Sequence, residues 1–434
     1  MTDARSELSL TFRLAIPLAA QQLGFQLMGI VDTAMLGRWS DAALAGAGVG
    51  NTLLFSIAAI GWGIVMGLDT VVPQALGAGR PDDARRYLDG GLRLAVLVGI
   101  AAMLAVVVSP RLLTIADVDP DIAREAKVYL YARSIGIVPF MLTIAYRSVL
   151  AAHHSTRVLV VAVIGGNIAN AILDLVLIYG AGLGVLGAAM ATVVVQIASL
   201  WLYIAAVRAI EGPTPRPRST TADLKTIAGY GWPVGGQMFA EIGVFGLATV
   251  VAAHLGKLPA AGHSIALNIA SFTFSASVGI GAATSVRVGH AVGSGDIALA
   301  RRRGMIGLVV GLAVMSAFAL TFLAIPTVLA RLFTNDAEVV AAAVPLLQIA
   351  ALFQLSDGTQ AIASGALRGL GDNRATFVAN LIGHYGVGLA ISLSLAFSAG
   401  MGAPGLWWGL SAGLTVTAVI LVARFVRSTS RSSR

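Results

Sequence analysis

The 434-residue chain contains no cysteine, which excludes disulfide bonds and thiolate metal sites. It is also poor in charge: Asp, Glu, Lys and Arg make up 12% of the residues, against about 25% in an average soluble chain. Catalytic signatures are scarce too, since the sequence holds no HExxH pair and no Walker A loop. The chain is therefore not expected to be an enzyme or a nucleotide-driven pump.

The chain is instead rich in long hydrophobic segments. Hydrophobic residues make up 57% of it, and apolar runs of 18 or more residues recur from one end to the other. Each run is long enough to cross the hydrocarbon core of a bilayer as a helix. The 50 glycines suit close packing of helices in lipid, and the short alternating segments of a membrane β-barrel are absent. We therefore expect an all-α, polytopic membrane protein.

Twelve transmembrane helices are predicted. Their bounds are 10–36, 44–76, 88–109, 128–150, 158–180, 185–208, 224–254, 260–291, 304–332, 340–367, 374–398 and 404–426. Lys and Arg concentrate in the loops after even-numbered spans, with fourteen there against six in the opposite loops. The positive-inside rule then places both termini and a basic C-terminal tail in the cytoplasm. Charges scattered in this way do not predict binding to nucleic acid.

The second half of the sequence resembles the first half, with a nearly constant offset between matching residues. The shift that lays Pro17 on Pro233 also lays "GAGRPDDARR" (77–86) on "GSGDIALARR" (293–302). Further along, a slightly larger shift lays "AGLGVLGAAMA" (181–191) on "AGMGAPGLWWG" (399–409). We expect two pseudo-symmetric six-helix bundles: an N-terminal lobe (1–210), a cytoplasmic linker (211–223) and a C-terminal lobe (224–434). Parallel repeats are typical of transporters, although a duplicated channel or scaffold would show the same pattern.

Acidic and amide side chains interrupt the spans of the first half. An ionised group in mid-membrane costs ~2.5–3.5 kcal/mol, so Asp32 in the first span is expected to face a bundle interior or a wet cavity. Asn170 and Asp174 are four residues apart on one face of the fifth span, and Thr192 lies in the sixth. Together these four residues could form an oxygen-lined pocket for a proton or for a hard cation such as Na⁺. A structural ion pair for Asp32 and ordinary interhelical hydrogen bonds for Asn170 and Thr192 are the alternatives.

The second half has its own buried acids. Glu241 lies in the seventh span and Asp357 in the tenth, and neither has a charged residue within one turn of its own helix. Membrane acids without a local partner are candidates for ion or substrate binding, so Na⁺ at Glu241 and Asp357 is an alternative to Na⁺ at Asp32 and Asp174. Acids in apolar surroundings favour lipophilic cations as substrates, and such cations would compete there with H⁺ or Na⁺.

Other polar residues in the spans receive structural interpretations. Asp69 is expected to form an ion pair with Arg147 or Arg287, near the ends of the helices. His384 lies in the middle of the eleventh span. We expect it to be a hydrogen-bonded core histidine, with a role in proton relay as the alternative.

Four motifs resemble the multidrug and toxic compound extrusion (MATE) transporters. They are "VDTAMLGRWSDAALAG", "GLDTVVPQALGAGR", "SVRVGHAVGSGD" and "FQLSDGTQAIASGALRGLGDNRATF", in family order and at matching spans. The resemblance implies a twelve-helix, two-lobe antiporter that exports organic cations in exchange for Na⁺ or H⁺, without a further cofactor. It also implies a monomer in the bacterial inner membrane. A lipid-linked oligosaccharide flippase of the same superfamily and a non-transport scaffold are the alternatives.

The resemblance also assigns roles to residues. It implies a coupling-ion site in the N-terminal lobe at Asp32, Asn170, Asp174 and Thr192. In the C-terminal lobe it implies coupling-ion or substrate binding at Glu241, Asp357 and Phe353. Asp174 resembles the DinF-type branch and the C-terminal acids resemble the NorM-type branch, so the sequence combines features of both and leaves the coupling ion open.

Overall fold

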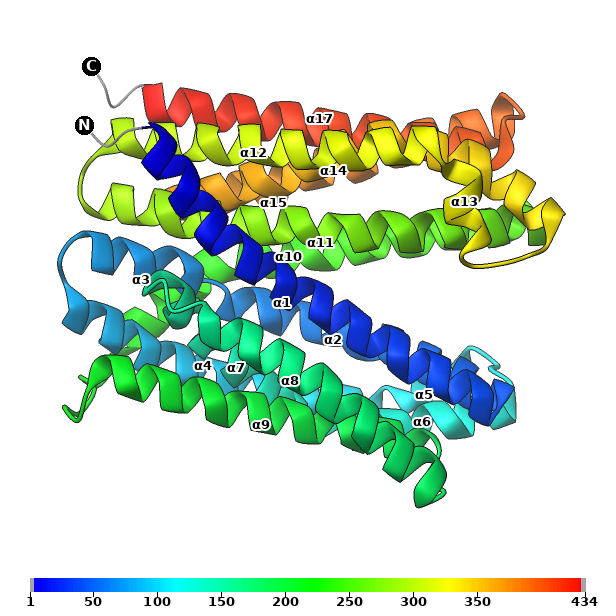
Figure 1. Cartoon of the computed structure of the whole chain (residues 1–434), viewed down its shortest axis with the longest axis horizontal. Coiled ribbons are helices and arrows are strands. Elements are labelled where there is room, and N and C mark those ends of the chain that lie inside the picture. Colours follow the sequence, from blue (N-terminus) through cyan, green and yellow to red (C-terminus); the bar gives the residue numbers. More distant parts are fainter. Residues whose placement is uncertain (1–3, 431–434) are drawn as a thin grey trace. The chain divides into compact units, whose positions relative to one another are not determined.

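The computed structural model describes residues 4–430, and over that range its regular elements are all helices (Figure 1). The all-α prediction is therefore confirmed. The last four residues of the predicted basic tail, 431–434, lie outside the described residues. Within the described range, the first turns of α1 and the last turns of α17 lie at the same end of one group of helices (Figure 1).

The helices follow the predicted spans with additional breaks. In chain order they are α1 (Ala4–Trp39), α2 (Asp41–Val65), α3 (Leu68–Gly77), α4 (Pro81–Val108), α5 (Pro110–Ile115), α6 (Pro120–Ser134), α7 (Ile137–Ala152), α8 (Arg157–Asp174), η1 (Leu175–Gly180), α9 (Val185–Glu211), α10 (Thr221–His254), α11 (Lys257–Gly293), α12 (Ile297–Ala324), α13 (Pro326–Arg331), α14 (Ala337–Leu370), α15 (Asn373–Asn380), η2 (Leu381–Leu389), α16 (Ala390–Leu393), η3 (Ser394–Ser398) and α17 (Gly402–Ser430). The η elements are π-helices.

Eleven helical stretches of the described chain are long and apolar enough to cross a membrane. The bent pair α6 and α7 supplies a twelfth span, with an angle of 49° between its two parts. The predicted continuous span at 128–150 is wrong in this respect. Pro139 explains the break, because a proline ring clashes with the carbonyl four residues earlier in an unbroken helix, here that of Ile135.

Another predicted span is interrupted in a similar way. The prediction of one helix over 304–332 is wrong, since α12 ends at Ala324 and α13 begins at Pro326. Proline is favoured at the first position of a helix, where its missing N–H has no partner to lose. Pro110, which the offset between Pro17 and Pro233 lays on Pro326, begins α5 in the same manner.

The described chain packs into two compact units. Unit 2 comprises residues 20–236, and unit 1 comprises residues 4–19 together with 237–430. The unit boundaries therefore fall inside α1 and α10, so each of these helices contributes its first part to one unit and its second part to the other. The predicted lobes, 1–210 and 224–434 with a linker at 211–223, differ from the units in this assignment and stay a prediction.

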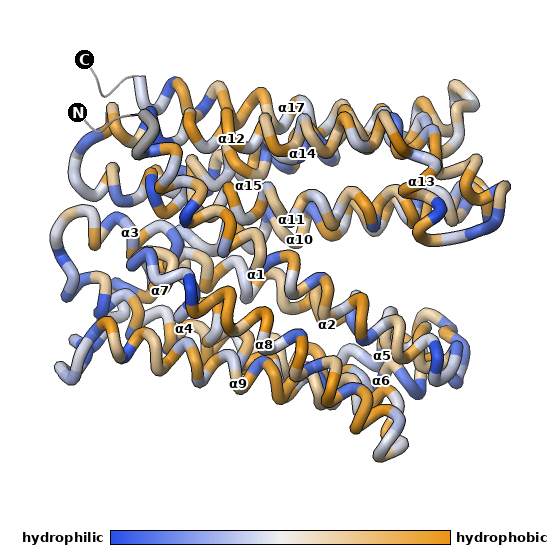
Figure 2. The backbone as a smooth tube through the Cα atoms, in the orientation of Figure 1, coloured by the Kyte–Doolittle hydropathy of each residue, from blue (hydrophilic) through white to orange (hydrophobic). Residues whose placement is uncertain are grey.

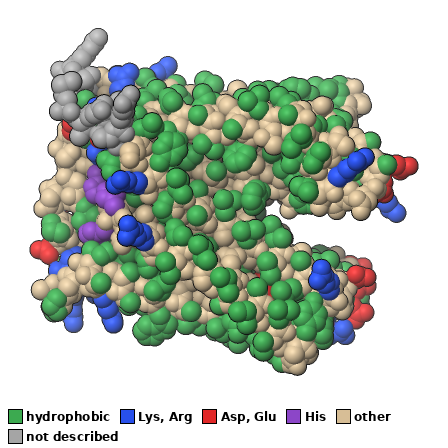
Figure 3. Space-filling model, viewed as in Figure 1, with side chains coloured by type: hydrophobic (Ala, Val, Ile, Leu, Met, Phe, Trp, Pro, Cys, Tyr) green, Lys and Arg blue, Asp and Glu red, His purple; other side chains and the backbone are tan. Residues whose placement is uncertain are grey.

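Apolar side chains cover the outer faces of the helices. Large hydrophobic residues such as Ile16, Trp201 and Leu320 are more than 60% exposed. Figure 2 shows hydrophobic colour along the lengths of the helices, and Figure 3 shows most Lys, Arg, Asp and Glu toward their ends. A surface of this kind matches a lipid environment, where exposed apolar residues carry no penalty.

Candidate functional site

Unit 2 brings all four predicted polar residues of the first half together. Thr192 of α9 donates a hydrogen bond to Oδ2 of Asp32 in α1 over 3.1 Å. Asp174 and Asn170, one turn apart on α8, lie beside the same carboxyl group. Asn170 and Asp174 are fully buried, whereas Asp32 is half-buried. The helical spacing read from the sequence therefore does place these side chains in one cluster, which we call the unit 2 acid site.

Several oxygens in the unit 2 acid site have no hydrogen-bond partner among the described residues. They are Oδ1 of Asp32, Oδ1 of Asn170 and both carboxyl oxygens of Asp174. Two adjacent carboxyl groups are stabilised by a shared proton or by a bound cation, and amide and carboxyl oxygens are the ligands that hard cations prefer. This donor set is of the kind that binds H⁺ or Na⁺.

Arg133 of α6 also belongs to this neighbourhood. It is 6% exposed and lies close enough to Asp32 for their charges to interact. Its Nη1 donates a hydrogen bond to Oε1 of Gln196 over 3.3 Å. Arg133 was not among the residues predicted for the site, although an arginine within the predicted span at 128–150 is the kind of signal that marks a site in a membrane helix.

Unit 1 holds a second site around Glu241 of α10. Its Oε1 accepts three hydrogen bonds: from Gln237 on the same helix over 3.0 Å, from Gln360 of α14 over 2.8 Å and from Asn380 of α15 over 2.6 Å. Each donor is a side-chain amide. Asp357 of α14 is buried nearby, close enough to Glu241 for their charges to repel. We call this group the unit 1 acid site.

An aromatic cluster adjoins the unit 1 acid site. The Phe353 ring, one turn before Asp357, lies 6.1 Å from Phe245 and 5.2 Å from Trp407, measured between ring centroids. Phe353 is 2% exposed, so its ring is packed into this cluster. The predicted role of Phe353 in substrate or ion binding stays a prediction.

Two histidines of unit 1 differ in their hydrogen bonding. His263 of α11 accepts a hydrogen bond on Nδ1 from Trp407 over 3.1 Å, and its Nε2 lies 3.3 Å from Oγ1 of Thr249. His384 in η2 is buried, and neither ring nitrogen has a hydrogen-bond partner among the described residues. The prediction of a hydrogen-bonded core histidine at position 384 is therefore wrong; it describes His263.

The predicted ion pairs separate into two groups. In unit 2, Arg147 of α7 pairs with Asp69 of α3 over 3.1 Å, as expected. In unit 1, Arg287 of α11 pairs with Glu7 in the first turns of α1, and Arg303 of α12 contacts the same carboxylate over 3.2 Å. These contacts of Glu7 were not predicted, because nothing along the chain indicates which acid an arginine meets when the two lie in opposite halves of the sequence.

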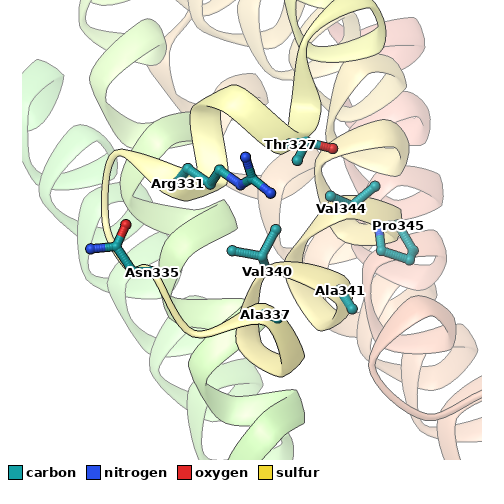
Figure 4. Close-up of a pocket in the computed structure, with 8 residues that line it drawn as sticks. All are labelled: Thr327, Arg331, Asn335, Ala337, Val340, Ala341, Val344 and Pro345. Atoms are coloured by element: carbon teal, nitrogen blue, oxygen red, sulfur yellow. The ribbon is translucent and has the colours of Figure 1, made fainter.

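A pocket of about 410 Å³ lies at the end of unit 1 that holds α13. Thr327, Arg331 and Asn335 supply its polar side chains, and apolar residues of α14 complete it (Figure 4). Its last lining residue on α14, Pro345, is twelve residues before Asp357, which is about 18 Å along a helix. This pocket is therefore separate from the unit 1 acid site.

The two acid sites contain carboxylates, amides and a hydroxyl, and neither provides a nucleophile with an adjacent base. Among the described residues, no group of three or more His, Cys, Asp or Glu side chains is arranged to hold a metal ion. The chemistry that the sites support is reversible binding of protons or of singly charged cations.

Known proteins resemble this chain over nearly its whole length. The sequence profile of the MatE family matches residues 17–176 and 233–394. Multidrug resistance protein NorM of Burkholderia vietnamiensis is 35% identical, with 97% of this chain and 94% of that protein aligned. A probable multidrug resistance protein NorM of Deinococcus radiodurans is 34% identical, with 98% and 96% aligned. The predicted NorM resemblance is confirmed, while the DinF-like feature rests on Asp174.

Solved structures show the same fold. The eukaryotic MATE transporter AtDTX14 superposes with a TM-score of 0.90 at 21% identity, over 99% of this chain and 98% of that one. An outward-facing multidrug resistance MATE family transporter of the MOP superfamily gives a TM-score of 0.92 at 18% identity, over 99% and 97%. The chain therefore belongs to the MatE family and is a membrane transporter, not an enzyme.

Proposed function

We propose that the protein is a secondary active multidrug efflux antiporter. It exports lipophilic organic cations in exchange for H⁺ or Na⁺ by alternating access. The observation that carries this proposal is the pair of acid sites, one in each unit, whose carboxylates form no direct ion pair with Lys or Arg of the described residues. Arg133 lies near Asp32, but it donates its hydrogen bond to Gln196. Carboxylates buried in a membrane protein without a fixed counter-ion are suited to bind a mobile one.

The substrate class follows from charge and surroundings. Negative carboxylates beside the aromatic cluster of Phe245, Phe353 and Trp407 favour a cation with an apolar body. Such a cation and the coupling ion would compete for the same negative charge, and competition of this kind couples the two fluxes. The names of the NorM relatives, which are multidrug resistance proteins, support export of several such compounds.

The setting of the transporter is also part of the proposal. The positive-inside pattern supports a bacterial inner-membrane location with both termini in the cytoplasm. The family profile matches the chain twice, at 17–176 and at 233–394. The starts of the two matches are separated by the same offset as Pro17 and Pro233, and their ends by the same offset as residues 181 and 399, which supports an internal repeat. We expect the protein to act as a monomer.

Charge argues against the flippase alternative. A carrier of a lipid-linked pyrophosphate would present unpaired cations to its substrate. The two buried arginines among the described residues are Arg287, paired with Glu7, and Arg133, which lies beside Asp32. The buried carboxylates without ion-pair partners instead favour a positively charged substrate.

The test is dye efflux from proteoliposomes driven separately by an imposed proton gradient and an imposed Na⁺ gradient. Ethidium serves as the lipophilic cation and an anionic dye as the comparison. The variants are Asp32→Asn, Glu241→Gln and Asp357→Asn, and Asp41→Asn, an exposed acid in the first turn of α2, is the matched control.

We expect ethidium, and not the anionic dye, to leave under at least one gradient, with loss in one or more acid-site variants and none in Asp41→Asn. Loss of proton-driven efflux in Asp32→Asn alone assigns coupling to unit 2. Loss of Na⁺-driven efflux in Glu241→Gln and Asp357→Asn assigns it to unit 1. Full activity in all three acid-site variants, or a wild type that no gradient drives, contradicts the proposal.

A further inference from the structure

His384 is a buried histidine without a hydrogen-bond partner. Its side chain is 1% exposed, and neither Nδ1 nor Nε2 reaches a donor or acceptor among residues 4–430. Buried polar groups in proteins are nearly always hydrogen-bonded, so an orphaned ring with two polar atoms needs a functional or structural reason. A site that binds and releases a small species is one such reason.

The local backbone turns this side chain toward α10. The π-helix η2 packs its glycines Gly383 and Gly388 closely against Gly413 of α17. His384 lies instead against Phe245 of α10, with ring centroids 6.1 Å apart and an angle of 66° between the rings. π-helical turns occur frequently at functional sites, where the additional residue in the turn re-aims a side chain.

Two pairs of residues align His384 with the unit 1 acid site. Glu241 and Phe245 are one turn apart on α10, while Asn380 and His384 are one turn apart on α15 and η2. Asn380 donates its hydrogen bond to Glu241, and His384 contacts Phe245. The histidine therefore lies one helical turn along from the Glu241 carboxylate, on the same interface between helices.

The charged groups around His384 are acidic. Glu241 faces it from α10, and Asp357 of α14 lies close to Glu241. The helix α17, which packs against η2, carries only Arg424 and Arg427 as charged residues, and Arg424 is eleven residues beyond the contact at Gly413, about 16 Å along the helix. An imidazolium at position 384 would therefore meet negative charge and no nearby positive charge.

We propose that His384 is a proton-binding site that exchanges its proton for the exported cation at the unit 1 acid site. The inference rests on the proposed antiport. A proton from the gradient binds one ring nitrogen, and the resulting imidazolium is held by the charge of Glu241. A lipophilic cation that arrives at Glu241 and Asp357 takes over that negative charge, repels the imidazolium, and the proton leaves. One positive charge replaces another, so the step is balanced.

Histidine suits this role because its imidazole can take up and release a proton, and the neighbouring carboxylate stabilises the charged form. The chain also offers a matched comparison. His263 is equally deep in unit 1, but its ring nitrogens are engaged by Trp407 and Thr249. His384 has no such hydrogen bonds among the described residues, so the two histidines should respond differently to pH and to substitution.

The direct test is NMR of ¹³C- and ¹⁵N-labelled histidine in nanodiscs between pH 5 and 8. It reads the rings themselves and does not require transport. The His384 signal is assigned by its absence in His384→Gln or, if that variant does not fold, in His384→Asn. We expect the His384 ring to change protonation in this range. At pH 6 its protonated fraction should be smaller after Glu241→Gln and after saturation with tetraphenylphosphonium. The proposal is overturned if the ring stays in one protonation state throughout. It is also overturned if neither Glu241→Gln nor tetraphenylphosphonium changes its protonated fraction.

The second test is the pH profile of ethidium efflux under a fixed proton gradient. We expect His384→Gln to reduce the ratio of the rates at pH 6 and pH 8 by at least threefold. His263→Gln should lower thermal stability and leave this ratio unchanged. Active wild type with an unchanged ratio in His384→Gln contradicts the histidine proposal while the antiport stands. If His384 changes protonation with pH but no gradient drives efflux by the wild type, the proposed antiport is contradicted instead.

Discussion

Gly63 of α2 and Gly235 of α10 meet backbone against backbone within unit 2. A Cβ atom built on Gly63 would lie 2.1 Å from the amide nitrogen of Gly235. No side chain fits there, since real Cβ atoms do not approach other atoms so closely. The contact holds the first part of α10 on α2, which is why unit 2 includes that part of the helix.

We predict opposite effects for two glycine-to-alanine substitutions on α10. In Gly235→Ala the new Cβ lies 2.5 Å from the carbonyl oxygen of Ile60, so the helices must separate and the apparent Tm in detergent should fall. In Gly229→Ala nothing lies within 4 Å, and alanine favours a helix over glycine by about 1 kcal/mol, so the Tm should rise or stay the same. Equal shifts for both variants, measured by thermal unfolding, would contradict the steric argument.

Unit 1 contains a close contact between helices that is equivalent to the contact of Gly63 with Gly235. A Cβ on Gly279 of α11 would lie 2.3 Å from the amide nitrogen of Ala19 in α1. The offset that lays Pro17 on Pro233 also lays Gly63 on Gly279 and Ala19 on Gly235. Each unit thus receives the first part of a helix whose second part belongs to the other unit, and it holds that part through small residues at matching positions.

A buried acid near the start of α1 accompanies this crossing, and its removal should destabilise the protein. Glu7 is 1% exposed and pairs with Arg287 and Arg303. Glu7→Gln leaves two arginine charges without their shared carboxylate. Loss of one partner of a buried pair typically costs about 3–5 kcal/mol, so a clear fall in apparent Tm is expected.

Glu338→Gln is the matched control for the Glu7 prediction. Glu338 is also an acid in the first turn of a helix, but it is exposed and its substitution should shift the Tm little. Asp223, in the first turn of α10 and laid on Glu7 by the same offset, pairs with the partly exposed Arg86 over 3.3 Å. Asp223→Asn should therefore cost less than Glu7→Gln. If the Glu7→Gln variant is as stable as the Glu338→Gln variant, the ion pairs of Glu7 with Arg287 and Arg303 do not stabilise the fold.

Hydropathy and helical period are local properties, so the sequence predicted that the chain crosses the membrane many times, although the spans at 128–150 and 304–332 were expected as unbroken helices. Asn170 and Asp174 share a helix face by spacing alone, and Asp32 had to turn inward because lipid does not solvate a charge. What it missed depends on contacts between distant segments. The partners of Glu241 on other helices, Gln360 and Asn380, lie far along the chain and leave no periodic signal in it.

The π-helices were also beyond prediction. The residue pattern of 374–398 is the same whether the helix closes its hydrogen bonds over four or five residues, so a uniform α-helix was expected there. The structure has η2 and η3 in this span. The expectation that His384 is hydrogen-bonded assumed a partner on a neighbouring helix, and the packing of η2 does not provide one among the described residues.

A hydroxyl in the unit 2 acid site should tune its affinity for the coupling ion. Thr192→Val removes the hydrogen bond to Oδ2 of Asp32 while it keeps the shape of the side chain. Hydrogen bonds to charged groups contribute about 1.5–3 kcal/mol, so the apparent affinity for the coupling ion in unit 2 should change by at least about tenfold. Thr33→Val is the control, because the hydroxyl of Thr33 donates its hydrogen bond to the carbonyl of Gly29 on its own helix. The measurement is the dependence of dye efflux on the concentration of the coupling ion. If Thr192→Val and Thr33→Val respond alike, Thr192 does not serve the site.

His153, which follows α7 in the chain, should make the fold less stable in mild acid. Burial lowers the pKa of its imidazole from the ordinary value of 6.5, although the negative charge of Glu211 opposes this in part. The unfolded chain, with the higher pKa, therefore binds the proton more readily. The contribution of His153 to stability is full above pH 6.5 and is lost as the pH falls below that value.

Replacement of His153 by glutamine removes this titration. The fall in apparent Tm between pH 7.5 and pH 5.5 should accordingly be smaller in His153→Gln than in the wild type. Other groups also titrate over this interval, but their effects are shared by both proteins and cancel in the difference. His254→Gln, at an exposed histidine, should retain the wild-type fall. If His153→Gln shows the wild-type fall as well, the half-buried imidazole does not carry the acid sensitivity.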